Sequence, residues 1–168
     1  GTNIPIGRGA FLDFDLRPAH DYNSLTRWGR LRSTLMANVT LAEALVVCEA
    51  AVAKAGEIGI KVAVAVVGSG TTLVCAQKMD GAIIVAVEGS RGKAVCSVIF
   101  GQPSGELEER SEHPTFRALQ IQYGGKFIMG QGAVPIFRDG EVIGACGVGG
   151  GTPQEDEDCA RAGIAAIE

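Results

Sequence analysis

The stretch from residue 132 to residue 161 constrains the fold more than any other part of this chain. It reads GAVPIFRDGEVIGACGVGGGTPQEDEDCAR, with two apolar runs separated by Asp139-Gly140, then three glycines and a polar segment. Asp-Gly between apolar runs is a strong signal of a β-hairpin, because glycine accepts the positive φ of a type I′ turn. Thr152 and Glu155 form a capping box around Pro153, which suits the first helical position. The stretch therefore predicts two strands joined by a tight turn, a glycine corner and a helix.

The glycine corner, Gly149-Gly150-Gly151, is open to two interpretations. Its N–H groups meet the positive end of the helix dipole, an arrangement that suits a carboxylate, a phosphate or a propionate. On that hypothesis Gly149, Gly150, Gly151 and Thr152 contact a small anionic ligand. The alternative is a close-packed turn from strand to helix, and the spacing matches neither a dinucleotide fold nor a P-loop.

Earlier segments alternate between helical and strand patterns. A second capping box, Thr40 with Glu43, opens a helix that we expect to run to about Glu57. After it we expect a hairpin of strands at 61–67 and 71–77. A helix from about Ala82 to Phe100 should follow, capped by Asp80 and with Ile83 directed toward the core. Short helical pieces in 105–122 and a strand at 126–136 complete this part. The order α-β-β-α-α-β-β-α with two hairpins predicts an α+β fold on an antiparallel sheet.

Residues 1–37 differ from the rest and are predicted to form an N-terminal arm, ahead of a single domain at 38–168. The arm holds His20, the only tryptophan, five arginines, an apolar stretch at 10–14 and a helical spacing of apolar residues at 25–35. Exposed phenylalanine and leucine normally dock on another surface. We expect that surface to belong to a neighbouring subunit or to the same subunit.

Composition narrows the classes of partner. The net charge is −4 and no basic cluster is interleaved with aromatic residues, so nucleic acid is not an expected partner. No apolar run is long enough for a spanning helix, so no membrane partner is expected either. The five cysteines are scattered and contain no C-x-x-C pair, which predicts buried thiols, a reducing cytoplasmic location and no structural metal site.

An ordered set of short motifs resembles the GlcG/HbpS-like family, which includes the C-terminal domain of PduO-type proteins. The resemblance covers about residues 38–168, and it rests on Asn38-Val-Thr-Leu-Ala-Glu-Ala, Val62–Val67 with Gly68-Ser-Gly, Met79-Asp-Gly-Ala, Arg91-Gly-Lys-Ala, Phe100-Gly-Gln-Pro and the stretch from Gly132 to Gly163. It implies a sheet of about five antiparallel strands flanked by helices, and homo-oligomers built from dimers, up to rings or octamers. Some relatives bind or help to degrade haem, and others belong to catabolic pathways for aromatic acids.

Few side chains in the chain carry obvious chemistry. His113 is one of two histidines, and histidine is a natural acid/base or iron ligand. The alternative is a histidine on a surface loop with no role in a pocket. Lys93 matches the family's lysine on the central helix and could hold an anion or donate a proton. Arg91 is expected either to pair with Glu88 three residues earlier or to bind the ligand, and Tyr123 and Lys126 supply further polar contacts.

Two functional hypotheses follow. In the first, the protein is an enzyme of the lyase, deaminase or isomerase type that acts on a small carboxylated intermediate, such as a hydroxylaminobenzoate-like aromatic acid. His113 and Lys93 would be catalytic and no cofactor would be required. In the second, the protein binds haem or another tetrapyrrole, or is an accessory protein without catalysis. Both place one cavity between the glycine corner, the central helix and the segment around His113.

Overall fold

The computed structural model describes residues 37–168. Apart from Ala37, the predicted arm with its apolar stretch, its helix and His20 lies outside the described residues. The elements are α2 (Leu41–Glu57), β1 (Ala63–Gly68), β2 (Leu73–Lys78), α3 (Ala86–Phe100), the 3-10 helix η3 (Ser104–Arg110), α4 (Pro114–Gln122), β3 (Ala133–Arg138), β4 (Glu141–Gly149) and α5 (Pro153–Ala165). No described helix is both long and apolar enough to cross a membrane.

The sheet has the order β2-β1-β4-β3, and each neighbouring pair is antiparallel. The α+β class is thus confirmed, but the described sheet has four strands where about five were expected. The segment from Lys126 to Gly132, expected to extend the strand before the hairpin, is irregular. Its backbone is bound to a helix instead, because the Ile128 N–H donates to the Gly92 carbonyl oxygen at 2.9 Å.

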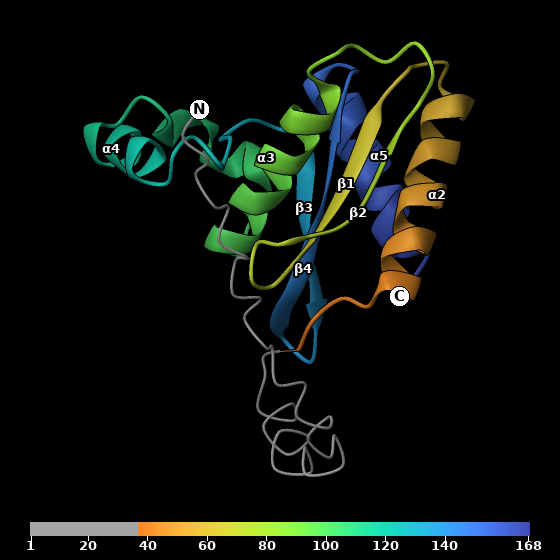
Figure 1. The fold of residues 1–168 in the computed structure, drawn as a ribbon, viewed down its shortest axis with the longest axis horizontal. Coiled ribbons are helices and arrows are strands. Elements are labelled where there is room, and N and C mark those ends of the chain that lie inside the picture. Colours follow the sequence, from red (N-terminus) through yellow and green to blue (C-terminus); the bar gives the residue numbers. More distant parts are fainter. Residues whose placement is uncertain (1–36) are drawn as a thin grey trace, which may run out of the picture. The chain divides into compact units, whose positions relative to one another are not determined.

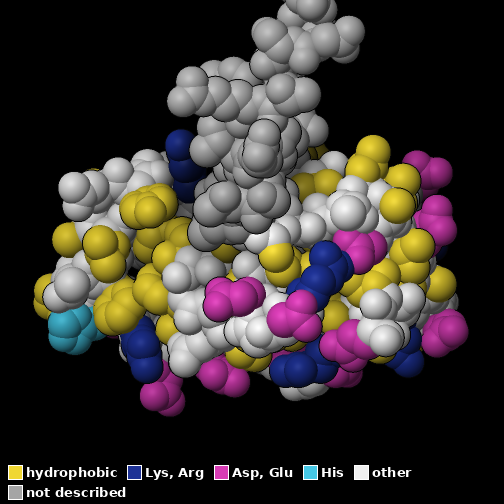
Figure 2. All heavy atoms as spheres, turned by 90° about the horizontal axis from the view of Figure 1, so that it is seen from below, with side chains coloured by type: hydrophobic (Ala, Val, Ile, Leu, Met, Phe, Trp, Pro, Cys, Tyr) yellow, Lys and Arg dark blue, Asp and Glu magenta, His cyan; other side chains and the backbone are white. Residues whose placement is uncertain are grey.

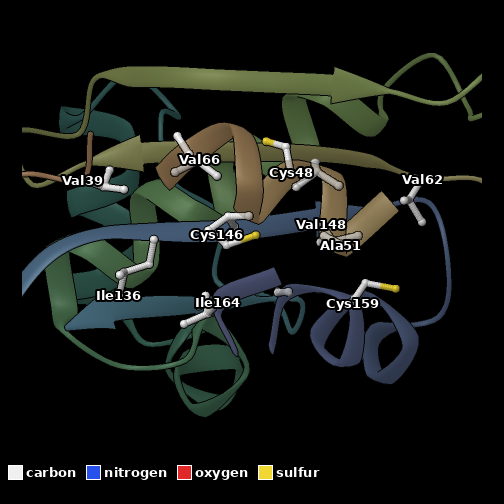
Figure 3. Packing of buried hydrophobic residues seen from close by; sticks show 14 of the residues in the cluster. Val39, Cys48, Ala51, Val62, Val66, Ile136, Cys146, Val148, Cys159 and Ile164 are labelled. Carbon is white, nitrogen blue, oxygen red and sulfur yellow. The ribbon is translucent and has the colours of Figure 1, made fainter. Parts of the chain in front are cut away.

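Helices cover both faces of the sheet, so the domain has three layers (Figure 1). All six residues of β1 are buried. Val64 and Val66 belong to the core formed with α2 and α5, which Figure 3 shows at close range. Val67 belongs to a second core with α3. The central strands therefore carry apolar residues on both faces, which explains their unbroken hydrophobic sequence.

The Asp139-Gly140 turn and the two capping boxes are confirmed. Asp139 and Gly140 have φ values of 52° and 83°, as the type I′ turn requires. Thr40 with Glu43 and Thr152 with Glu155 both form complete capping boxes at the starts of α2 and α5. These interactions join residues three apart, which is why the sequence alone predicts them.

The start of the central helix was predicted wrongly. Helix α3 begins at Ala86, four residues later than expected. Its N-cap residue is Val85 and not Asp80, and Val85 makes no side-chain hydrogen bond. Two tight turns precede it, closed by hydrogen bonds from Ala82 N to Met79 O and from Ala86 N to Ile83 O. As a result Ile83 is 57% exposed rather than directed to the core.

Candidate functional site

The glycine corner is a closely packed turn. A Cβ atom on Gly149 would lie 3.0 Å from the Ala86 carbonyl oxygen, and one on Gly150 would lie 2.4 Å from the Lys61 carbonyl oxygen. Gly150 also has a φ of +135°, which side chains disfavour. Glycine at these positions is thus required by the close approach of α3 and of the segment before β1.

The donors at the start of α5 are bonded to carboxylates of the helix itself. The Gly151 N–H donates to Asp156 Oδ1 at 2.9 Å, and the Thr152 N–H donates to Glu155 Oε2 at 2.8 Å. Bonds from the Thr152 backbone and then from its side chain lower the pKa of the Glu155 carboxyl. The carboxylates of Asp156 and Glu155 therefore occupy the position at this helix end where the sequence predicts the anionic group of a ligand.

Lys93 reaches the same carboxyl group. Its Nζ atom lies 2.8 Å from Asp156 Oδ2 and donates to the Val148 carbonyl oxygen at 3.1 Å. The Lys93 side chain is 15% exposed and that of Asp156 is 3% exposed. The structure thus brings Lys93 and Gly151 together on Asp156, where they join α3, the end of β4 and α5 through a buried ion pair.

Arg91, Tyr123 and Lys126 come together elsewhere, around a cleft of about 390 Å³. Helix α3 forms one wall and the segment from 123 to 128 forms the other. The cleft is lined by Thr71, Glu88, Arg91, Gly92, Val95, Tyr123, Gly124, Gly125, Lys126 and Ile128. Neither His113, Lys93 nor the glycine corner belongs to this lining, so the structure does not unite all the predicted residues in one cavity.

Gly92 lets the second wall approach the helix. A Cβ atom on Gly92 would lie 2.6 Å from the Ile128 side chain. The same two residues share the backbone hydrogen bond from Ile128 N to Gly92 O. With Val95, they give the cleft an apolar floor beside its charged groups. A glycine within a helix interior costs stability, and this one is explained by the close approach.

Two cations stand at the cleft without an acidic partner in the part of the chain that the structure describes. No ion pair among residues 37–168 includes Arg91 or Lys126. The expected pair between Glu88 and Arg91 is absent from those ion pairs, although both residues line the cleft. Two cations without an acidic partner among residues 37–168, above an apolar floor, suit a flat ligand with carboxylate groups.

His113 serves as the N-cap of α4. Its Nδ1 atom accepts a hydrogen bond from the Thr115 N–H at 3.3 Å, and its ring lies 6.1 Å from that of Phe116. Pro114 occupies the first turn of that helix. The side chain is exposed. The capping of α4 is therefore sufficient to explain why a histidine stands at position 113.

A second cavity of about 360 Å³ lies along the edge strand β3, between the end of α5 and the segment after α3. Its cation, Arg161, donates from Nε to Glu157 Oε1 at 2.9 Å. Because that charge is already paired, this cavity is less suited to an anion than the cleft beside α3. On the face that Figure 2 shows, acidic and basic side chains of the described residues lie side by side.

The molecule is thus a three-layer α+β domain with a cleft beside α3 that is lined by Arg91 and Lys126. Comparison with known proteins gives the family: residues 39–165 match the family described as "Haem degrading protein HbpS-like", and the chain belongs to it. An uncharacterized 15.0 kDa protein of Citrobacter freundii is 32% identical over 74% of this chain and 89% of that protein.

Two further comparisons concern PduO. The corrinoid adenosyltransferase PduO of Salmonella typhimurium is 30% identical over 70% of this chain, a match that spans 35% of PduO. The crystal structure of a PduOC:haem complex has a TM-score of 0.72 and 28% identity, and the match covers 79% of this chain and 96% of that one. The similarity to PduO is therefore confined to one part of that longer protein.

Proposed function

We propose that this protein binds haem or a closely related tetrapyrrole in the cleft beside α3. The observation that carries the proposal is the pair Arg91 and Lys126, which flank an apolar floor and have no acidic partner among the described residues. A tetrapyrrole of this class is a flat apolar ring with carboxylate groups at its edge. The cleft offers the complementary surfaces.

The lining residues fit haem in three respects. Arg91 and Lys126 would hold the propionates through charge-assisted hydrogen bonds. Gly92, Val95 and Ile128 would contact the ring. Tyr123 is about half exposed, lines the cleft and carries a phenol oxygen of the kind that binds haem iron. Bound haem would supply iron redox chemistry at this site.

The comparisons support the same proposal. The description of the family names haem degradation, and the crystal structure of the PduOC relative, which is 28% identical, is that of a complex with haem. The predicted lyase, deaminase or isomerase activity has no such support, and neither of its proposed catalytic residues lines the cleft. We therefore place haem binding ahead of catalysis on a carboxylated aromatic compound.

Assembly into a homo-oligomer also stays a proposal. Ile83, Ile84 and Val85 are consecutive and are 57%, 94% and 64% exposed, and apolar patches of this kind commonly mark an interface. Light scattering of the full chain would measure the number of subunits directly.

Titration with ferric haem tests the proposed function. We expect the wild-type protein to shift the Soret band, and the double variant Arg91→Glu/Lys126→Glu to bind about tenfold more weakly or worse, because two attractions become repulsions of roughly 1 kcal/mol each. The matched control is Lys78→Glu/Arg117→Glu, which changes the same net charge at two exposed cations outside the cleft. Equal affinities of the two variants would refute the assignment of the cleft.

Tyr123→Phe tests the phenol separately. It keeps the ring and removes the oxygen, so we expect haem to remain bound with a displaced ferric Soret band. An unchanged spectrum would remove Tyr123 as an iron ligand while leaving the cleft in place.

A further inference from the structure

Four of the five cysteines gather between the sheet and the two helices on one of its faces. Cys48 of α2, Cys146 of β4 and Cys159 of α5 belong to one buried core, and Cys75 of β2 packs against it. Figure 3 labels Cys48, Cys146 and Cys159 among the side chains of that core. Cys96 belongs to the separate core on the other face.

The strand register places two of these cysteines in one row across the sheet. Val66 of β1 pairs with Cys75 on one side and with Cys146 on the other. Directly opposed residues share a face, so Cys75 and Cys146 point the same way as Val66, toward the core under α2. Adjacent strands are about 4.8 Å apart, so two strand spacings separate Cys75 from Cys146 by roughly 10 Å, beyond the reach of a disulfide.

Cys48 lies on α2, the helix that covers this row of residues. Helix α2 packs against both β1 and β2. Burial raises the pKa of the Cys48 thiol, and the neighbouring Cys75 side chain is the next cause, ahead of Cys146. Cys159 lies on α5, which packs against β3 and β4, whereas Cys48 lies on α2, which packs against the strand that carries Cys75. Cys48 is therefore the cysteine of this face whose helix packs against β2.

The thiols also differ in their access to solvent. Cys48, Cys146 and Cys159 are fully buried, whereas Cys75 lies on the edge strand and is half-buried. An oxidant in solution therefore reaches the Cys75 sulfur before the Cys48 sulfur. The accessible thiol and the buried thiol thus have the properties of an attacking and a resolving cysteine.

We propose that Cys48 and Cys75 form an oxidation site at which a hydroperoxide produces an intramolecular disulfide. The Cys75 sulfur attacks hydrogen peroxide, the O–O bond breaks, and Cys75 becomes a sulfenic acid while its thiol proton leaves with the hydroxide as water. Cys48 then attacks the Cys75 sulfur, the S–O bond breaks, and the thiol proton leaves with the hydroxyl as water. Two thiols and one peroxide give one disulfide and two waters. The bond would fix α2 to the edge strand β2.

The test uses the full chain, reduced and then treated with hydrogen peroxide. Free thiols are alkylated under denaturing conditions and the protein is analysed by mass spectrometry with peptide mapping. We expect the loss of two of the five alkylation sites, a peptide that joins residue 48 to residue 75, and full reversal by dithiothreitol. The matched control Cys96→Ser, on the opposite face, should give the same disulfide, and Cys75→Ser should abolish it.

Other results overturn the proposal. They are a disulfide that contains Cys96, Cys146 or Cys159, a bond between two chains only, or conversion of Cys75 to sulfinic acid without pairing. Peptide mapping of the wild-type protein decides among these even where a cysteine variant fails to fold.

Discussion

Replacement of Gly147 by alanine is expected to lower the free energy of unfolding by at least about 3 kcal/mol, a large share of a typical domain's stability. The added Cβ atom would lie 2.1 Å from the Ser90 carbonyl oxygen and 2.9 Å from the Ala94 backbone nitrogen. Both are backbone atoms of α3, so no rotamer change can relieve the overlap. Because β4 is bonded on both sides, by β1 and β3, it cannot move away without breaking the sheet.

Gly89→Ala is the matched control for that variant. Gly89 lies in the same helix, and among the described residues a Cβ atom there would meet nothing within 4 Å beyond the helix's own backbone. We expect this substitution to stabilise the domain by about 0.5–1 kcal/mol, because alanine loses less backbone entropy in a helix. Urea unfolding followed by circular dichroism measures both values. A Gly147→Ala protein as stable as the wild type would show that α3 does not rest on β4 as described.

Lys93→Met is expected to cost about 3 kcal/mol of unfolding free energy, because it leaves the Asp156 carboxylate buried without its cation. Asp156 is only 3% exposed, so water cannot replace the ammonium group. The Gly151 N–H would remain as a partner, which is insufficient for a buried charge. Thermal and urea unfolding at neutral pH would measure the loss.

A second substitution separates the ion pair from simple loss of packing. Asp156→Asn keeps an oxygen for the Gly151 N–H and removes the charge. The double variant Lys93→Met/Asp156→Asn should therefore be more stable than Lys93→Met alone, by about 1 kcal/mol or more. If the double variant lost as much unfolding free energy as the two single variants together, Lys93 and Asp156 would not interact as the geometry indicates.

The sequence predicts local features of the fold well and long-range ones poorly. The hairpin at Asp139-Gly140 and the capping boxes depend on residues that are neighbours in the chain, and both are confirmed. The partner of Lys93 is 63 residues away, at a position where the sequence shows only one of several acidic residues at a helix start. A sequence pattern cannot distinguish the buried Asp156 from its exposed neighbours before the fold is known.

The candidate cleft shows the same division. Arg91, Tyr123 and Lys126 were predicted as ligand contacts from two separate segments, and the structure places all three around one cleft. Glu88, Val95 and Ile128 were missed because nothing in their sequence context distinguishes them from surface or core residues. Gly92 is the residue of this cleft whose sequence context could have indicated it, since a glycine inside a helix often marks the close approach of another segment.

Nuclear magnetic resonance of the labelled protein with substoichiometric ferric haem tests the central claim most directly, because the paramagnetic iron broadens the amide signals nearest to it. The proposed site predicts the strongest broadening at Gly92, Gly124, Gly125 and Lys126, and weaker broadening at Gly149 to Gly151. Broadening centred on the glycine corner, or no broadening at any residue of the cleft, would contradict it.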